Sequence, residues 1–93
     1  MTRYFFHMRD RDVLVRDPDG SELSDLVAAI GEAKLGARAI MAADIEHGRP
    51  VRPIVIEITD AAEQVLKIVT FREVLDELAA PLYARRGSRC WCA

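Results

Sequence analysis

Histidine, carboxylate and thiol groups are the side chains of this sequence that could carry out chemistry. His7 lies within an aromatic segment, R-Y-F-F-H-M-R over residues 3–9, and the other histidine is the distant His47. A histidine that binds a metal or transfers a proton needs a partner at a suitable spacing, and neither H-E-x-x-H nor a related motif occurs. We therefore interpret His7 as a structural or surface residue, with catalysis or metal binding as the less favoured alternative.

The acidic segment D-P-D-G-S-E, residues 17–22, has the composition of a calcium loop. An EF-hand loop needs acidic or amide ligands at its first positions, glycine at position 6 and glutamate at position 12. When Gly20 is placed at position 6, Val15 and Leu26 occupy the first and last ligand positions. The segment is therefore predicted to be an acidic turn.

Cys90 and Cys92 are the only cysteines. Two thiolates are too few for a structural zinc site, which needs four ligands, and a disulfide between them would close a strained ring. The chain also lacks a G-x-S-x-G nucleophile motif and a phosphate-binding glycine motif. We expect no metal and no cofactor, and enzymatic activity is disfavoured.

Size and charge limit the classes of partner. The 93 residues suffice for one domain, and 13 basic and 15 acidic side chains give a net charge of −2, which does not favour nucleic acid as a partner. No apolar run is long enough to cross a bilayer, and the N-terminus has no signal-peptide pattern. We expect a cytoplasmic protein.

The alternation of side-chain types predicts a first hairpin from residues 3–9 and 13–16. The D-P-D-G turn ends this hairpin, because proline and glycine favour turn conformations. A long helix is predicted from Ser24, as its N-cap, to about His47. Its apolar stripe consists of Leu26, Ile30, Ala33, Ala37, Ile40 and Met41. Gly31 and Gly36 each destabilise such a helix by about 1 kcal/mol, and we expect packing against a sheet to offset this.

A second hairpin and a short helix complete the predicted fold. Residues 54–59 and 65–70 alternate as strands, and residues 72–83 have helical apolar spacing that only Pro81 interrupts. The order β-β-α-β-β-α predicts an α+β fold, in which the long helix packs on one face of a four-stranded, mainly antiparallel sheet. Residues 1–84 are expected to form a single domain, and residues 85–93 a flexible C-terminal tail.

The chain also contains an ordered set of short motifs. These include R-Y-F-F-H at residues 3–7, R-D at 9–10, I-T-D at 58–60 and V-T-F-R at 69–72. Together, over residues 2 to about 75, they resemble an uncharacterised family of small bacterial domains of unknown function with an N-terminal R-Y-F-F-H signature. Arg11 and Glu63 stand where the turns of that family usually carry glycine. The resemblance implies one compact bacterial domain and no assigned reaction.

Alternation divides the strand residues between two sheet faces. The face under the long helix is predicted to contain Tyr4, Phe6, Met8, Val13, Val15, Ile54, Ile56, Ile58, Leu66 and Ile68. The opposite face, which we call the second sheet face, is half apolar, and the predicted interaction surface consists of Phe5, His7, Arg9, Leu14, Arg16, Val55, Glu57, Val65, Lys67 and Val69. An apolar patch of this extent is usually covered, here either by the C-terminal helix or by a second copy of the chain.

Three functional hypotheses follow. The leading one is a non-enzymatic protein-interaction module that self-associates as a homo-oligomer through the second sheet face. The first alternative is nucleic-acid binding, with Phe5 stacking on bases and Arg3, Arg9 and Arg16 contacting phosphate. The second alternative is a small enzyme or ligand-binding domain centred on His7 and a carboxylate such as Glu57.

Overall fold

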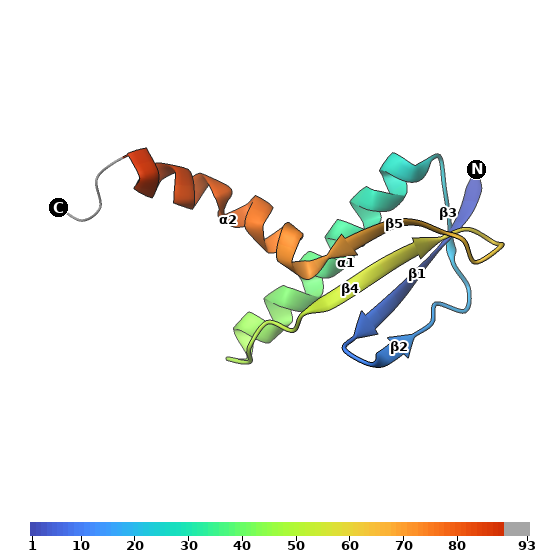
Figure 1. Cartoon of the computed structure of the whole chain (residues 1–93), viewed down its shortest axis with the longest axis horizontal. Coiled ribbons are helices and arrows are strands. Elements are labelled where there is room, and N and C mark those ends of the chain that lie inside the picture. The colour runs from blue at the N-terminus through green and yellow to red at the C-terminus, as the bar shows by residue number, and fades with distance from the viewer. Residues whose placement is uncertain (89–93) are drawn as a thin grey trace.

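A twisted antiparallel sheet lies on one long helix, and a second helix projects from the end of the sheet (Figure 1). The computed structural model describes the backbone of residues 1–88 and the side chains of residues 1–80. The elements are β1 (Thr2–Asp10), β2 (Val13–Val15), β3 (Ser21–Leu23), α1 (Leu26–Glu46), β4 (Ile54–Thr59), β5 (Val65–Thr70) and α2 (Phe71–Ser88). The α+β class and the long helix on one face are confirmed.

The sheet has five strands, one more than predicted. Its main path is β2-β1-β4-β5, and β3 pairs antiparallel with the first residues of β1. The additional strand was missed because its three residues, S-E-L, have no alternating pattern of their own. Pairing with β1, Thr2 with Leu23 and Tyr4 with Ser21, therefore determines its conformation.

Helix α1 begins one residue later than predicted. Asp25, and not Ser24, is the N-cap, because its Oδ1 accepts a hydrogen bond of 2.9 Å from the amide of Ala28. The helix ends at Glu46, and Gly48 follows with a φ of +69°. That left-handed conformation suits glycine and stops the helix as expected.

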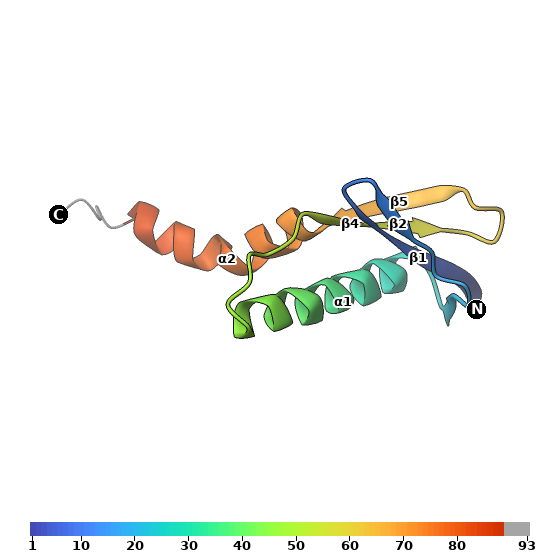
Figure 2. The same cartoon turned by 90° about the horizontal axis from the view of Figure 1, so that it is seen from below.

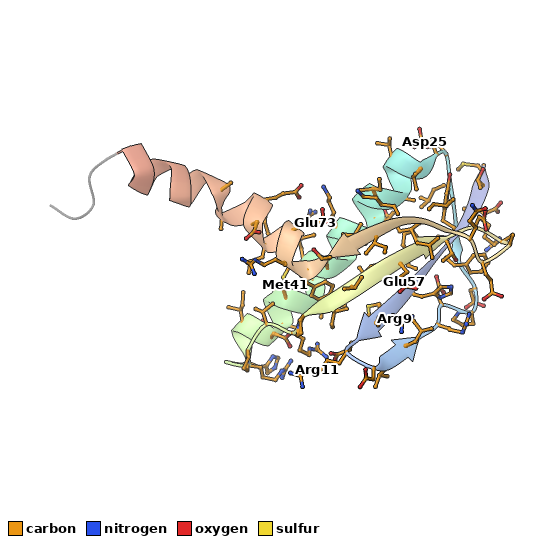
Figure 3. All side chains as sticks on the ribbon, in the orientation of Figure 1. Arg9, Arg11, Asp25, Met41, Glu57 and Glu73 are labelled. Carbon is orange, nitrogen blue, oxygen red and sulfur yellow. The ribbon has the colours of Figure 1, made fainter. Side chains whose placement is uncertain are left out.

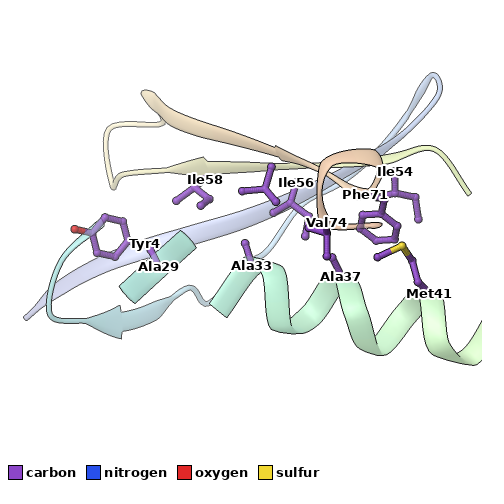
Figure 4. Close-up of a cluster of buried hydrophobic side chains, with 11 residues drawn as sticks. Tyr4, Ala29, Ala33, Ala37, Met41, Ile54, Ile56, Ile58, Phe71 and Val74 are labelled. Carbon is purple, nitrogen blue, oxygen red and sulfur yellow. The ribbon is translucent and has the colours of Figure 1, made fainter. Parts of the chain in front are cut away.

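The core lies between α1 and the sheet (Figure 4). Three alanines of α1, Ala29, Ala33 and Ala37, face isoleucines of β4, and their small side chains allow the helix to lie close to the strand. Phe71 and Val74, from the first turn of α2, complete the core at the other end. Gly31 and Gly36 do not contribute to this packing, since a Cβ added to either would meet no atom within 4 Å.

Helix α2 follows β5 without a connecting residue. Thr70 and Glu73 form a capping box, in which the Glu73 amide donates to Thr70 Oγ1 at 3.0 Å and the Thr70 amide donates to Glu73 Oε1 at 2.8 Å. The helix includes Pro81 and continues to Ser88, beyond its predicted end near Tyr83. The first residues of the predicted tail, 85–88, therefore belong to α2, while 89–93, including both cysteines, lie outside the described residues.

Neither helix, over the residues that the structure describes, is long and apolar enough to cross a bilayer.

A buried carboxylate fixes the loop between α1 and β4. The Asp44 side chain is fully buried, and its oxygens accept hydrogen bonds of 3.2 Å from the Nε atoms of Arg49 and Arg52. Burial alone would raise the pKa of Asp44, but the hydrogen bonds and charges of Arg52 and Arg49 outweigh burial and lower this pKa below its usual 3.8. These hydrogen bonds, which we call the Asp44 clamp, hold residues 49–52 against the end of α1.

Arg11 and Glu63 occupy left-handed turn positions, with φ angles of 59° and 63°. Glycine is the residue that adopts this conformation without strain. A glycine at either position would therefore fit the backbone without strain.

Candidate interaction surface

Strand register determines which residues share the second sheet face. Phe5, His7 and Arg9 of β1 pair with Thr59, Glu57 and Val55 of β4, and paired residues point to the same side of a sheet. On the other side, Ile56 and Ile58 are buried under α1 and Phe6 packs against them. The observed second sheet face consists of Phe5, His7, Arg9, Leu14, Val55, Glu57, Thr59, Val65, Ile68 and Thr70. The predicted division of β1 and β4 is confirmed.

The prediction for β5 was wrong at four residues. Val69 pairs with Ile56 and is completely buried on the α1 side, and Lys67 pairs with Ile58 on the same side. Leu66 and Ile68, which were assigned to the core, are exposed. The cause is a register shift opposite Ile58 and Thr59, which leaves Leu66 as an extra residue and reverses the alternation after it.

The valines of β2 also differ from prediction. Val13 and Val15 pair with residues of β1 that point toward α1, so they lie on the expected side. They nevertheless remain 61% and 54% exposed. The helix does not extend far enough to cover this edge of the sheet.

No described helix covers the second sheet face, and only its end at His7 and Thr59 is buried, next to the loop of residues 16–20. Figure 2 shows α1 beneath the sheet and α2 extending away from the sheet end, so neither helix lies on the opposite side. Val65 and Ile68 are each 48% exposed, and Phe5, Leu14 and Val55 are half-buried. Helix α2 cannot cover them, because its Val74 is buried in the core on the α1 side.

An ion pair lies in the middle of this face (Figure 3). Arg9 Nε donates to Glu57 Oε2 at 3.0 Å, from adjacent strands. The Arg9 side chain is 43% exposed and that of Glu57 is 18% exposed. The face therefore combines apolar side chains with one internally matched pair of charges.

His7 is buried and both of its ring nitrogens have partners. The amide of Asp17 donates to Nδ1 at 3.0 Å, and Nε2 lies 3.3 Å from Thr59 Oγ1. An amide can only donate, so Nδ1 must be the acceptor and the ring proton must be on Nε2. His7 is thus the neutral Nε2–H tautomer, and it donates to Thr59. Its ring orients the neighbouring loop, and its hydrogen-bond partners within the described part of the chain are the Asp17 amide and the Thr59 hydroxyl.

Asp17 fastens the loop of residues 16–20 to β1. Its Oδ2 accepts from the amide of Phe6 at 3.2 Å, and its Oδ1 accepts from the amides of Asp19 and Gly20 at 3.3 and 3.2 Å. Phe6 lies between the parts of β1 that pair with β2 and β3, where no strand provides a partner for its amide. The acidic turn is therefore structural, as predicted, and its carboxylate replaces a strand partner.

The three arginines that the nucleic-acid alternative assigns to phosphate are all paired with acidic residues. Arg3 donates to the Asp19 carbonyl at 2.7 Å and lies 3.5 Å from Glu22. Arg16 lies beyond β2, where it forms an ion pair of 2.7 Å with Glu63 of the β4–β5 turn. The structure brings Arg9 onto the second sheet face but places Arg16 at its end and Arg3 near β3.

A pocket of about 370 Å³ opens at this end of the face, between the loop of residues 16–20 and the β4–β5 turn. It is lined by Phe5, His7, Arg16, Asp17, Pro18, Thr59, Asp60, Ala61 and Glu63. Thr59 was not among the predicted residues. The signal that could have found it is alternation, because Thr59 continues the Val55 and Glu57 series of β4.

Among the described residues, no three histidine, cysteine, aspartate or glutamate side chains are placed to hold a metal ion.

Residues 3–72 match a family model described as "Domain of unknown function (DUF6894)". No curated protein and no solved structure matches the chain.

Proposed function

The chain belongs to the DUF6894 family of domains of unknown function, and on this premise we propose that it is a protein-interaction module that self-associates through its second sheet face. The observation that carries the proposal is that this face has apolar side chains from all four strands of the main sheet path and no described helix over it.

The composition of the face fits a protein partner. A half-exposed apolar cluster of Phe5, Leu14, Val55, Val65 and Ile68 would lose solvent-exposed apolar area on association, which is favourable at about 25 cal/mol per Å². Such clusters with a polar border are typical of interfaces.

The charges favour a second copy as the partner. In a twofold dimer the same face of both copies forms the interface, so that face must be complementary to itself. The second sheet face contains one arginine and one glutamate in adjacent strands, Arg9 and Glu57. An antiparallel stacking of two such faces can place Arg9 of each copy near Glu57 of the other, while a face with charges of one sign could not self-associate.

The two alternatives have less support. Phosphate binding would have to displace the carboxylates that pair with Arg9 and Arg16, in a chain with a net charge of −2. Base catalysis by His7 would require a free ring nitrogen, and both nitrogens are hydrogen-bonded.

Sedimentation velocity over a concentration series tests the proposal. We expect the wild type to form a reversible dimer, and Ile68→Glu to weaken it at least tenfold, because the substitution places a charge within the apolar face. Val27→Glu is the matched control, since Val27 is 76% exposed on α1, on the other side of the molecule, and should leave the dimer unchanged. A wild type that stays monomeric at all attainable concentrations would contradict self-association.

A further inference from the structure

The pocket at the end of the second sheet face is lined by a threonine hydroxyl that accepts one hydrogen bond and can donate another. Thr59 is 3% exposed and lines the pocket. Because the Nε2–H of His7 donates to its oxygen, the Thr59 hydroxyl hydrogen must point elsewhere. Among the described residues, the structure gives no acceptor for this hydrogen.

Each buried side-chain nitrogen and oxygen that the structure describes has a hydrogen-bond partner, and the partner of Thr59 is His7, which leaves the donor capacity of the hydroxyl unused. A ligand with an acceptor atom would satisfy it. The pocket volume of about 370 Å³ lies within the range of small-molecule sites, which begins at about 300 Å³.

The walls of the pocket favour a flat ring. Phe5 and His7 stand on one face of β1 with their rings stacked, at a centroid distance of 6.3 Å and an interplanar angle of 20°. Pro18 and Ala61 supply further apolar surface from the two flanking loops. Offset stacking on an exposed aromatic ring is the arrangement that aromatic pairs prefer.

The charges of the pocket exclude an anion. Asp17, Asp60 and Glu63 line it together with a single cation, Arg16, which is already paired with Glu63. A negatively charged ligand would therefore be repelled.

From these observations we infer that the pocket binds a small planar ring that carries a hydrogen-bond acceptor and no negative charge, with the ring on Phe5 and the acceptor on the Thr59 hydroxyl. The site is preorganised, because Asp17 and His7 fix one wall to β1. The inference does not require self-association, although a dimer through the second sheet face and a ligand on Phe5 would compete for the same side chain.

Three probes with one ring and different substituents test it. Benzamide offers a neutral acceptor, benzoate offers an acceptor with negative charge, and benzamidinium offers positive charge without an acceptor. Titrations are followed by amide chemical shifts in ¹H–¹⁵N spectra of the full chain, in the wild type and in the Ile68→Glu background. The second background separates ligand binding from any change in oligomeric state.

We expect benzamide to shift the amides of Phe5, Thr59 and Ala61 and to bind at least threefold more tightly than benzoate. Thr59→Val should weaken benzamide binding about three- to tenfold, the effect of losing one hydrogen bond. Thr59→Ser keeps the hydroxyl and should retain binding. Thr59→Val also removes the acceptor of the His7 Nε2–H, so the spectra of both variants are compared with that of the wild type to establish that the fold is intact.

Three results would overturn the inference. The first is the absence of saturable shifts around the pocket with benzamide. The second is benzoate binding as tight as that of benzamide. The third is benzamidinium binding more tightly than benzamide with no effect of Thr59→Val, because acidic attraction alone would then explain the binding.

Discussion

A single left-handed glycine allows the loop of residues 16–20 to lie against β1. Gly20 has a φ of +70°, and a Cβ at this position would lie 2.9 Å from the Tyr4 carbonyl oxygen and 3.0 Å from Phe5 Cδ2. Both the backbone conformation and the close approach require glycine. The Asp17 and His7 hydrogen bonds depend on that approach, so one residue without a side chain positions the wall of the pocket.

Gly20→Ala should therefore destabilise the fold by about 2 to 4 kcal/mol, combining left-handed strain with a backbone clash. Gly48→Ala is the matched control, because Gly48 has nearly the same φ, +69°, and no atom within 4 Å of an added Cβ. We expect it to cost only about 1 kcal/mol. Urea unfolding measures both, and equal losses would contradict the steric argument.

Asp44 should make the free energy of unfolding depend on pH in the acidic range. A pKa lowered in the folded state means that the carboxylate stabilises the fold fully above the unfolded-state value, near 3.8, and that the contribution is lost as the pH falls through the lower folded-state pKa. Asp44→Asn should be less stable than the wild type at neutral pH, and the difference should shrink below pH 3.8.

Thermal unfolding across that pH range provides the measurement. Asp12→Asn, in the exposed β1–β2 turn, removes the same charge without a buried partner and should leave the profile of the wild type in place. A difference between Asp44→Asn and the wild type that is constant with pH would argue against the Asp44 clamp.

Elements whose apolar residues recur with a helical or strand period were predictable from the sequence. Elements whose conformation depends on pairing with a distant strand were not. Helix α1 and strands β1 and β4 follow from apolar spacing, and the faces of β1 and β4 were assigned correctly. The predicted stripe of α1 contained the buried Ala33, Ala37 and Met41 but missed the buried Ala29 and Asp44. Strand β3 has no such pattern, and the bulge at Leu66 reverses the faces of β5, so Lys67 and Val69 were misplaced on the predicted surface. Bulges and short edge strands depend on contacts between segments distant in sequence, which local alternation does not encode.

The candidate site shows the same division. Phe5, His7, Arg9, Leu14, Val55, Glu57 and Val65 were placed on the second sheet face from alternation alone. The pocket was not predictable, because it forms only where two turns far apart in the sequence meet over β1.

Helix α1 should tolerate, and benefit from, the loss of a glycine. Gly31 is in the helix interior with open space where a Cβ would stand. Gly31→Ala should raise the free energy of unfolding by about 1 kcal/mol through helix propensity alone. Chemical denaturation measures the change, and a destabilised variant would mean that another surface packs closely on this residue.

The whole molecule is longer than a compact chain of its size. Its radius of gyration is 15.8 Å, where a compact chain of 93 residues is expected near 12 Å, and its principal extents are 55, 27 and 20 Å. The projection of α2 accounts for the length (Figure 1). Within residues 71–80, whose side chains the structure describes, α2 contacts the rest of the chain through the core residues Phe71 and Val74 and through the 2.8 Å ion pair between Lys34 and Glu77.

Small-angle X-ray scattering of Ile68→Glu, the variant expected to be monomeric, should give a radius of gyration close to 15.8 Å. The same measurement on the wild type should rise with concentration as dimers form. A monomer value near 12 Å would mean that α2 folds back onto the sheet and that the second sheet face is covered internally.

The junction between β5 and α2 also has a mechanical consequence. Thr70 ends the strand, Phe71 begins the helix, and the reciprocal bonds of Thr70 and Glu73 lock the two elements at their joint. Because no loop residue separates β5 from α2, the junction has no hinge, and the strand and the helix are expected to rotate together as a rigid body. A load applied to the far end of α2 would be transmitted as torque to β5, at the border of the sheet.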